Sequence, residues 1–284
     1  MTGASIGRRR FLAAIGAALG ATAVGVIAAG TRSSGGDTSA VVTTATSPQA
    51  ATTSTATVPS TTALPATTSP PGKIIPATTT PATTTSPSRS AIPVICRDAW
   101  GAQPVTGDFT KHTIDRIMVH HTAVVLAANG EAPGRARQHQ DYHQGLGWPD
   151  LAYHYLIDAN GNVYEGRPLD AVGDTATEYD PTGYLLVCCE GDFNKQEIGV
   201  AQVAALVDML AWGAAEFGVD PVAIRGHRDV ASTTCPGDHL YRLLEDGSLI
   251  AAVSAAIDAG APALSLLCGE EAVALVAAIE AGSA

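Results

Sequence analysis

The chain has 284 residues, an aromatic content of 5% and a formal net charge of −11. That length accommodates one or two domains. Residues 91–284 hold ten Lys and Arg against 26 Asp and Glu, so the acidic excess belongs to the second part of the chain. Domains that bind nucleic acid usually carry a basic face, and we therefore expect no nucleic-acid partner.

The first thirty residues have the pattern of an export signal. Arg8-Arg9-Arg10-Phe11-Leu12 precedes an Ala- and Gly-rich apolar run that ends at Gly30. Paired arginines followed by Phe-Leu are similar to the twin-arginine motif, although Gly7 stands where Ser or Thr is common. An apolar run of about 20 residues also suffices to span a bilayer, so an uncleaved membrane tether is the alternative. We expect export by the twin-arginine route, to the cell envelope or the extracellular space.

Residues 31–90 are dominated by Thr and Pro, with 19 Thr and 8 Pro among 60 residues. They show no periodic apolar pattern, so they cannot bury enough surface to offset the entropy lost on ordering. Composition of this kind is typical of O-glycosylated spacers. We predict a disordered linker between the N-terminal segment and a folded part.

From residue 92 onward the pattern changes to predicted strands and helices. Strands are predicted at 113–119, 153–158, 162–165, 184–190 and 222–225, with a hairpin turn at Asn160-Gly161. Helices are predicted at 134–144, 199–217, 238–244, 248–259 and 270–281. This alternation indicates an α/β class with a mixed central β-sheet flanked by helices. We place the main domain at 91–246 and a C-terminal helical extension at 247–284.

Three polar side chains have the types and positions that a metal centre needs. His120-His121 ends a predicted strand, where side chains project into a cleft, and His227 and Cys235 lie eight residues apart on a later loop. Two imidazoles and a thiolate are ligands that Zn²⁺ prefers, and three protein ligands leave a fourth position for water. Taken alone, the pattern also fits structural or exposed histidines and a buried cysteine.

The chain has five cysteines, so at least one is unpaired, reactive or metal-bound if the protein is exported. With Cys235 assigned to a metal, Cys96, Cys188, Cys189 and Cys268 remain. A Cys96–Cys268 disulfide would tie the start of the domain to its C-terminal helix. The alternative is that all four are buried thiols, which behave as small apolar groups.

Six segments, in order along the chain, resemble one known family. They are ICRDAWGA at 95–102, MVHHTA at 118–123, GWPDLAYHYLI at 147–157, GNVYEGR at 161–167, GHRDV at 226–230 and TTCPG at 233–237. The family is that of the zinc N-acetylmuramoyl-L-alanine amidases, which includes phage lysozyme-type enzymes and the animal peptidoglycan recognition proteins. The similarity covers residues 95–244 and implies the fold of peptidoglycan recognition proteins and type 2 amidases.

The resemblance implies a ligand set and a reaction. His120, His227 and Cys235 match the zinc ligands, with His121 the second choice, because neighbours on a strand point to opposite faces. The implied function is a zinc hydrolase that cleaves the amide bond between N-acetylmuramic acid and L-alanine in peptidoglycan. Together with the signal pattern of residues 1–30, this predicts an exported enzyme, which we expect to be a monomer. A muramyl peptide is the implied substrate.

Further roles follow by position. Tyr153 matches the catalytic tyrosine and would donate a hydrogen bond to the developing oxyanion. Thr233 matches a catalytic Thr that would position the water or stabilise the same charge. Asp229 is expected to orient His227 or to cap its loop.

Some positions around the expected site are less settled. Glu190 is a candidate proton donor, with a structural acid as the alternative, and His154 is the remaining histidine expected nearest the site. The family often has a His where this chain has Gly173-Asp174-Thr175. That departure bears on the stem-peptide preference more than on the chemistry.

A non-catalytic peptidoglycan-binding module is the main alternative function. Members that only bind usually lack a Cys at the position of Cys235, so this residue favours the hydrolase. A regulator that uses the fold for protein contacts is a further alternative. A cysteine peptidase is disfavoured, because Pro236 directly follows Cys235 and His227 shares its loop, which fits a shared metal better.

Overall fold

The computed structural model describes residues 90–284, which belong to one compact unit. The expected signal or anchor at 1–30 lies outside the described residues, as does the expected linker at 31–90 except for its last residue.

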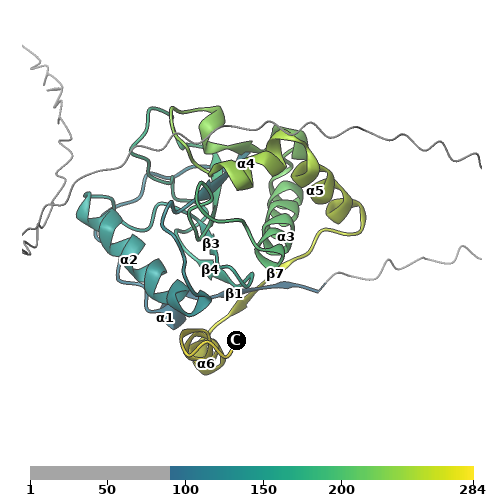
Figure 1. Cartoon of the computed structure of the whole chain (residues 1–284). Helices are drawn as coiled ribbons and strands as arrows, with labels where there is room; N and C mark the ends of the chain where they lie inside the picture. The colour runs from purple at the N-terminus through teal and green to yellow at the C-terminus, as the bar shows by residue number, and fades with distance from the viewer. Residues whose placement is uncertain (1–89) are drawn as a thin grey trace, which may run out of the picture. The chain divides into compact units, whose positions relative to one another are not determined.

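A seven-stranded mixed sheet forms the centre of the domain, in the order β6-β2-β5-β3-β4-β1-β7 (Figure 1). The antiparallel pair is β3 with β4, and the other five neighbouring pairs are parallel. The strands are β1 (Ile92–Ile95), β2 (Arg116–His121), β3 (Tyr155–Ile157), β4 (Val163–Glu165), β5 (Tyr184–Cys189), β6 (Arg225–Gly226) and β7 (Leu264–Leu267). The predicted α/β class with a mixed central sheet is confirmed.

Helices cover both faces of this sheet (Figure 1). They are α1 (Arg97–Trp100), α2 (Ala132–Gly145), α3 (Val200–Phe217), α4 (Asp238–Glu245), α5 (Ser248–Asp258) and α6 (Gly269–Glu280). The larger core, between the sheet and α3, α4 and α5, contains Ile117, Leu185 and Leu206. A smaller core under α1, α2 and α6 contains Trp100 and Leu156.

The five predicted helices are confirmed, each to within two residues at either end. The predicted strand at 222–225 is wrong, because Pro221–Ala223 is a 3-10 turn and the strand that follows is only Arg225–Gly226. Asp220 causes the turn, since its side chain accepts a hydrogen bond from the Val222 N–H, and Pro221 presets the backbone angle φ.

The central strand β5 is buried along its whole length. Strands covered on both faces read as continuous apolar runs, and this one is YLLVCC. It pairs with β2 in parallel, with His120 opposite Cys188 and His121 opposite Cys189. Because successive side chains point to opposite faces, the two histidines of β2 lie on different sides of the sheet.

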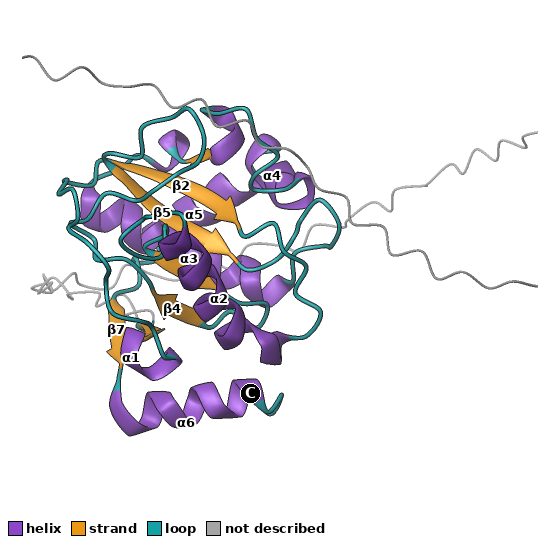
Figure 2. Cartoon of the chain, turned by 90° about the vertical axis from the view of Figure 1, so that its left-hand side faces the viewer, coloured by secondary structure: helices purple, strands orange, loops and turns teal. Residues whose placement is uncertain are grey.

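The C-terminal extension completes the sheet edge, which the sequence did not predict. β7 pairs in parallel with β1, and α6 packs on α1 and α2 with Ala272, Val276 and Ile279 buried. Figure 2 shows β7, α1 and α6 at the same end of the sheet. The extension is therefore part of the folded domain.

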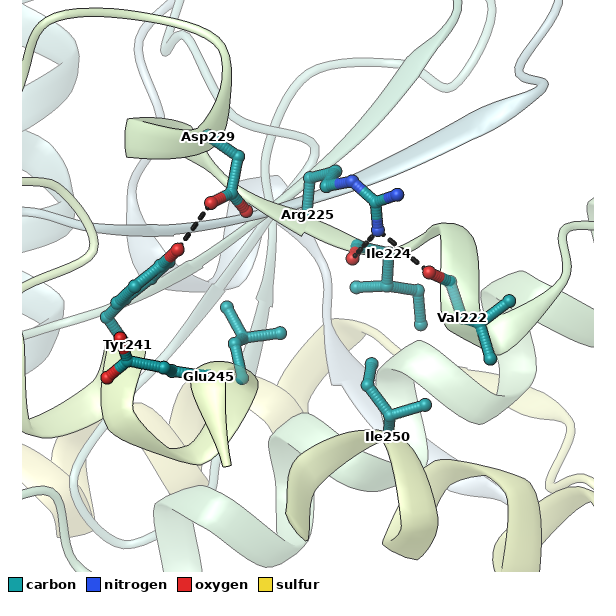
Figure 3. Close-up of a pocket in the computed structure, with 8 residues that line it drawn as sticks. Val222, Ile224, Arg225, Asp229, Tyr241, Glu245 and Ile250 are labelled. Atoms are coloured by element: carbon teal, nitrogen blue, oxygen red, sulfur yellow. Dashed lines mark hydrogen bonds between the residues drawn. The ribbon is translucent and has the colours of Figure 1, made fainter. Parts of the chain in front are cut away.

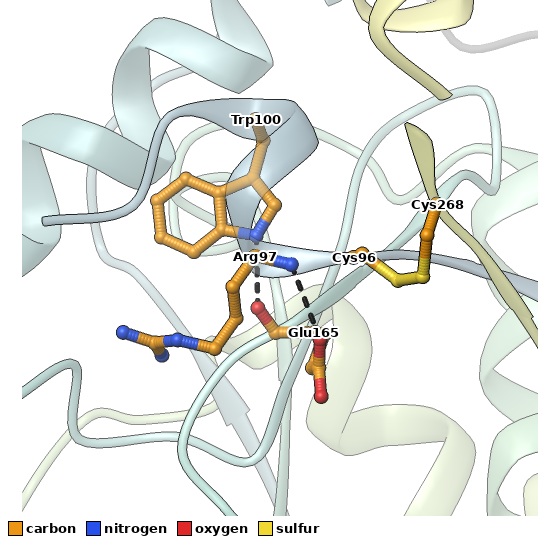
Figure 4. The surroundings of a disulfide bond; sticks show 5 residues. All are labelled: Cys96, Arg97, Trp100, Glu165 and Cys268. Carbon is orange, nitrogen blue, oxygen red and sulfur yellow. Dashed lines mark hydrogen bonds between the residues drawn. A yellow bond between two sulfur atoms is a disulfide. The ribbon is translucent and has the colours of Figure 1, made fainter. Parts of the chain in front are cut away.

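A disulfide between Cys96 and Cys268 joins the end of β1 to the start of α6, so the pairing considered above is present (Figure 4). Beside it, Trp100 Nε1 donates to the Glu165 carbonyl at 2.9 Å, and the Arg97 N–H donates to the Glu165 carboxylate at 3.1 Å. These contacts hold α1 and the extension against β4.

Removing this disulfide is expected to destabilise the domain. The bond joins residues separated by 172 positions, and cross-linking a long loop restricts the unfolded chain strongly. Cys268→Ser should lower the free energy of unfolding by about 2–5 kcal/mol, measured by denaturant titration. Reductant should lower the stability of the parent and leave the variant unchanged. Equal stability of parent and variant without reductant would contradict the prediction.

Candidate metal centre

The sequence-predicted metal ligands meet at the carboxyl end of β2. His120 is the fifth residue of that strand, and His227 and Cys235 lie on the loop between β6 and α4. All three line a cavity of about 220 Å³. The carboxyl ends of parallel strands are where α/β domains place ligand sites.

The three side chains form one donor set. One ligand atom from each of His120, His227 and Cys235 lies within 4.8 Å of the other two, and all three residues are buried. His120 Nδ1 is 3.6 Å from Cys235 Sγ, and the two imidazole rings are 4.7 Å apart. Two imidazoles and a thiolate are a zinc donor set with one position left for water.

The protonation states of these groups suit a cation. Burial lowers the pKa of His227 to about 4 and the pKa of His120 well below its usual value, so both rings are neutral at pH 7. Without a cation, burial raises the pKa of the Cys235 thiol to about 12. A buried thiolate needs a positive partner, and the neighbours of Sγ are the neutral ring of His120 and the backbone N–H of His121, which donates at 3.4 Å.

The second ring nitrogen of His120 does not by itself identify a metal site. Nε2 of His120 is buried and has no hydrogen-bond partner among residues 90–284. The same holds for Nε2 of His121, so the fit to a metal rests on the three donors, of which His120 turns Nδ1 toward Cys235 Sγ. The residues present therefore fit zinc.

His121 does not belong to the donor set. Its ring lies on the other side of β2, where Nδ1 accepts the N–H of Phe193 at 3.3 Å and the ring stacks on that side chain. The geometry therefore favours His120 as the ligand, as the family resemblance of the sequence motifs implied.

Asp229 caps the ligand loop and does not contact the His227 ring. Its carboxylate accepts the Gly226 N–H at 2.8 Å. It also accepts the Tyr241 hydroxyl at 2.6 Å, as Figure 3 shows. The contact to His227 comes instead from Thr177, whose Oγ1 lies 2.8 Å from Nε2. A second hydroxyl, from Thr175, is 2.8 Å from Thr177 Oγ1. The two threonines thus hold the imidazole from the opposite wall of the cavity.

Both predicted catalytic side chains line the cavity. The Tyr153 ring is 5.3 Å from the His120 ring. Burial, together with the nearby Cys188 and Cys235, raises the pKa of the Tyr153 hydroxyl well above its usual value, so it stays protonated and can donate a hydrogen bond. Thr233 Oγ1 accepts the Cys235 N–H at 3.2 Å, which fixes the backbone of the ligand.

The two remaining candidates from the sequence, His154 and Glu190, lie outside the lining of the cavity. His154 uses both ring nitrogens on backbone, with Nδ1 accepting from the Leu186 N–H at 2.9 Å and Nε2 3.1 Å from the Ala171 carbonyl. Glu190 is buried, and its carboxylate is 3.1 Å from both Thr122 Oγ1 and His139 Nε2. Neither residue lines the cavity. Both positions are therefore structural supports in this arrangement.

His143 is a site residue for which the sequence motifs predict no role. It lines the cavity between Trp148 and Tyr153, with ring separations of 4.9 Å and 5.8 Å. Burial lowers its pKa to about 3, and Nδ1 accepts the Ala152 N–H at 3.1 Å. The proton of the neutral ring therefore resides on Nε2, which makes that nitrogen a donor. Its spacing of four residues from His139 on α2 was the only signal in the sequence.

The Thr177 contact predicts a measurable effect on metal affinity. Hydrogen bonds to the second nitrogen of a metal-binding His orient the ring, and losing one typically weakens binding 10- to 100-fold. Thr177→Val should raise the zinc dissociation constant by about that factor, measured by competition with a chromophoric chelator, while Thr177→Ser retains parental affinity. Parental affinity in the Val variant would show that the contact does not position His227.

Comparison with known proteins agrees with this geometry. Residues 110–238 match the family model described as Amidase_2, N-acetylmuramoyl-L-alanine amidase. Peptidoglycan-recognition protein SC2 of Drosophila melanogaster is 31% identical over 155 residues, which cover 53% of this chain and 83% of that protein. Peptidoglycan recognition protein 1 of Mus musculus is 31% identical over 157 residues, covering 54% of this chain and 86% of that protein.

A solved structure supports the same assignment. The crystal structure of Drosophila peptidoglycan recognition protein SD superposes with a TM-score of 0.50 and 27% identity, covering 54% of this chain and 94% of that one. The cavity, its donor set and these similarities concern the same stretch of sequence. The chain belongs to the family of peptidoglycan recognition proteins and type 2 N-acetylmuramoyl-L-alanine amidases.

Proposed function

We propose that this protein is an exported zinc hydrolase that cleaves the amide bond between the lactyl group of N-acetylmuramic acid and L-alanine in bacterial peptidoglycan. The observation that carries the proposal is the donor set of His120, His227 and Cys235 in a cavity that opens to solvent. A closed structural zinc site would have four protein ligands, whereas three leave a position for chemistry.

The alternative is a module that binds peptidoglycan without cutting it. Cys235 disfavours this alternative, because family members that bind peptidoglycan without cleaving it usually have another residue at this position. The surroundings of Cys235 also favour a metal ligand. Its buried thiol lies beside two imidazoles at the cavity wall, where packing alone would not require a cysteine. Tyr153 and Thr233 add to the case for hydrolysis by lining the same cavity.

The side chains around the donor set have separable roles. Zinc held there would act as a Lewis acid toward the scissile carbonyl and would favour deprotonation of water. Tyr153 supplies a hydroxyl donor for the charge that develops on the carbonyl oxygen. His143 offers Nε2–H as a second donor on the same wall, for a substrate oxygen. Thr233 holds the backbone of the ligand Cys235 in place.

Export is the part of the proposal that rests on residues 1–30. The Arg8-Arg9-Arg10-Phe11-Leu12 sequence and the apolar run after it support it. The Cys96–Cys268 disulfide within the domain fits an oxidising compartment outside the cytoplasm. A protein delivered there would meet peptidoglycan directly.

The proposal predicts coupled loss of zinc and activity. The purified full chain should contain about one zinc and release L-alanine amino termini from peptidoglycan, because three protein ligands hold one ion. Cys235→Ser should lose both properties, and Cys189→Ala, which alters a buried thiol outside the cavity, should lose neither.

Two other results would overturn the hydrolase. Stoichiometric zinc without cleavage of any muramyl peptide would make the centre structural. Retention on insoluble peptidoglycan by a zinc-free chain would indicate the binding module.

Tyr153→Phe tests the hydroxyl donor separately from the metal. Removing one donor to a developing oxyanion typically lowers kcat about 100- to 1,000-fold. We expect that loss with zinc content unchanged and KM nearly unchanged, measured by steady-state hydrolysis of a soluble muramyl peptide. If Tyr153→Phe kept the parental kcat, the Tyr153 hydroxyl would have no catalytic role and the ring would serve only to pack against His120.

A further inference from the structure

The cavity contains one charged side chain besides the metal ligands. Of the residues that line it, Asp174 is the only Asp, Glu, Lys or Arg. It lies on the loop between β4 and β5, on the wall that also carries Thr175 and Thr177.

Arg167 holds this carboxylate in place. The Arg167 side chain is buried and donates to the carbonyls of Leu151 at 2.8 Å, Asp150 at 3.0 Å and Val172 at 2.5 Å. Its Nη2 also donates to Asp174 Oδ2 at 2.5 Å, the one ion pair that Arg167 forms among residues 90–284. The charge of a buried guanidinium needs a partner, so Asp174 is fixed by the fold as well as by its loop.

The backbone before Asp174 has no room to adjust. A Cβ at Gly173 would lie 2.2 Å from Leu186 Cδ1 and 2.8 Å from the Ala152 carbonyl oxygen. The backbone at Gly173 therefore packs directly against Leu186 of β5 and the Ala152 carbonyl. With Oδ2 bound to Arg167, the other oxygen of Asp174, Oδ1, has no hydrogen-bond partner in the described part of the chain, and the side chain is 28% exposed. One carboxylate oxygen thus remains available to a molecule in the cavity.

The size of the cavity limits which part of a substrate meets Asp174. Its volume of about 220 Å³ equals that of about seven waters at ~30 Å³ each. Because the cavity opens to solvent, it encloses the groups next to the scissile amide while the rest of a substrate extends beyond it. In a muramyl peptide the first carboxyl group beyond that amide belongs to the second stem residue, and it occurs either free or as the carboxamide.

We infer that Asp174 selects muramyl peptides whose second stem residue carries a carboxamide over those in which it carries a carboxylate. The inference rests on the proposed amidase function. A carboxylate oxygen accepts hydrogen bonds and donates none, so it pairs with the carboxamide N–H. A substrate carboxylate at the same place would meet a fixed like charge without a donor between them.

The test compares two muramyl tripeptides that differ only in that group, with the zinc-loaded full chain. We expect kcat/KM of the parent to favour the carboxamide by at least about tenfold, since the acid form alone would face the fixed carboxylate of Asp174 with a like charge. Asp174→Asn, which is isosteric but uncharged, should bring the two values within about threefold by accelerating the acid form. Asp174→Glu should keep the preference, as should Asp180→Asn, which removes a charge on the same loop outside the cavity.

Each result has a defined meaning. Equal rates of the parent on both substrates, or a preference for the acid, would overturn the role of Asp174 while leaving the amidase intact. An unchanged preference in a folded, zinc-containing Asp174→Asn variant would overturn it too. Cleavage of neither substrate by the parent would refute the proposed function itself. If Asp174→Asn fails to fold, the parental ratio together with that of Asp174→Glu still decides.

Discussion

The parallel pairing of β2 with β5 is the constraint on which the site depends. It buries both strands and sends His120 to one face of the sheet and His121 to the other. The loop after β6 can then deliver His227 and Cys235 only to the face that His120 occupies. A shift of one residue in this register would exchange the two histidines and separate the donor set.

Two loops beside the β2–β5 pair form the walls of the cavity, and they contribute different side chains. The ligand loop is held by Asp229, which accepts from Gly226 and Tyr241 behind the site. The β4–β5 loop approaches from the opposite wall and contributes a hydroxyl to His227 and a carboxylate to the cavity. The β4–β5 loop therefore serves the donor set, through Thr177, and the opposite wall of the cavity, through Asp174.

Much of this was readable from the sequence, for physical reasons that differ by element. Helices such as Val200–Phe217 repeat apolar residues over several turns, so their period identifies them. β1 and β7 are four-residue strands with no such repeat. β7 is positioned by its pairing with β1 and by the disulfide between Cys96 and Cys268, which directly follow the two strands. The ligands came from motif resemblance and strand alternation. Thr177 and His143 were missed, because their roles arise from contacts that no local pattern encodes, such as the bond from Thr177 to a residue 50 positions away.

X-ray absorption at the zinc edge of the purified full chain would identify the atoms bound to the metal. We expect two nitrogen ligands at about 2.0–2.1 Å, one sulfur at about 2.3 Å and one light atom from solvent. Cys235→Ser should remove the sulfur contribution. A spectrum without sulfur, or one with four protein ligands and no solvent position, would contradict the open His120–His227–Cys235 centre.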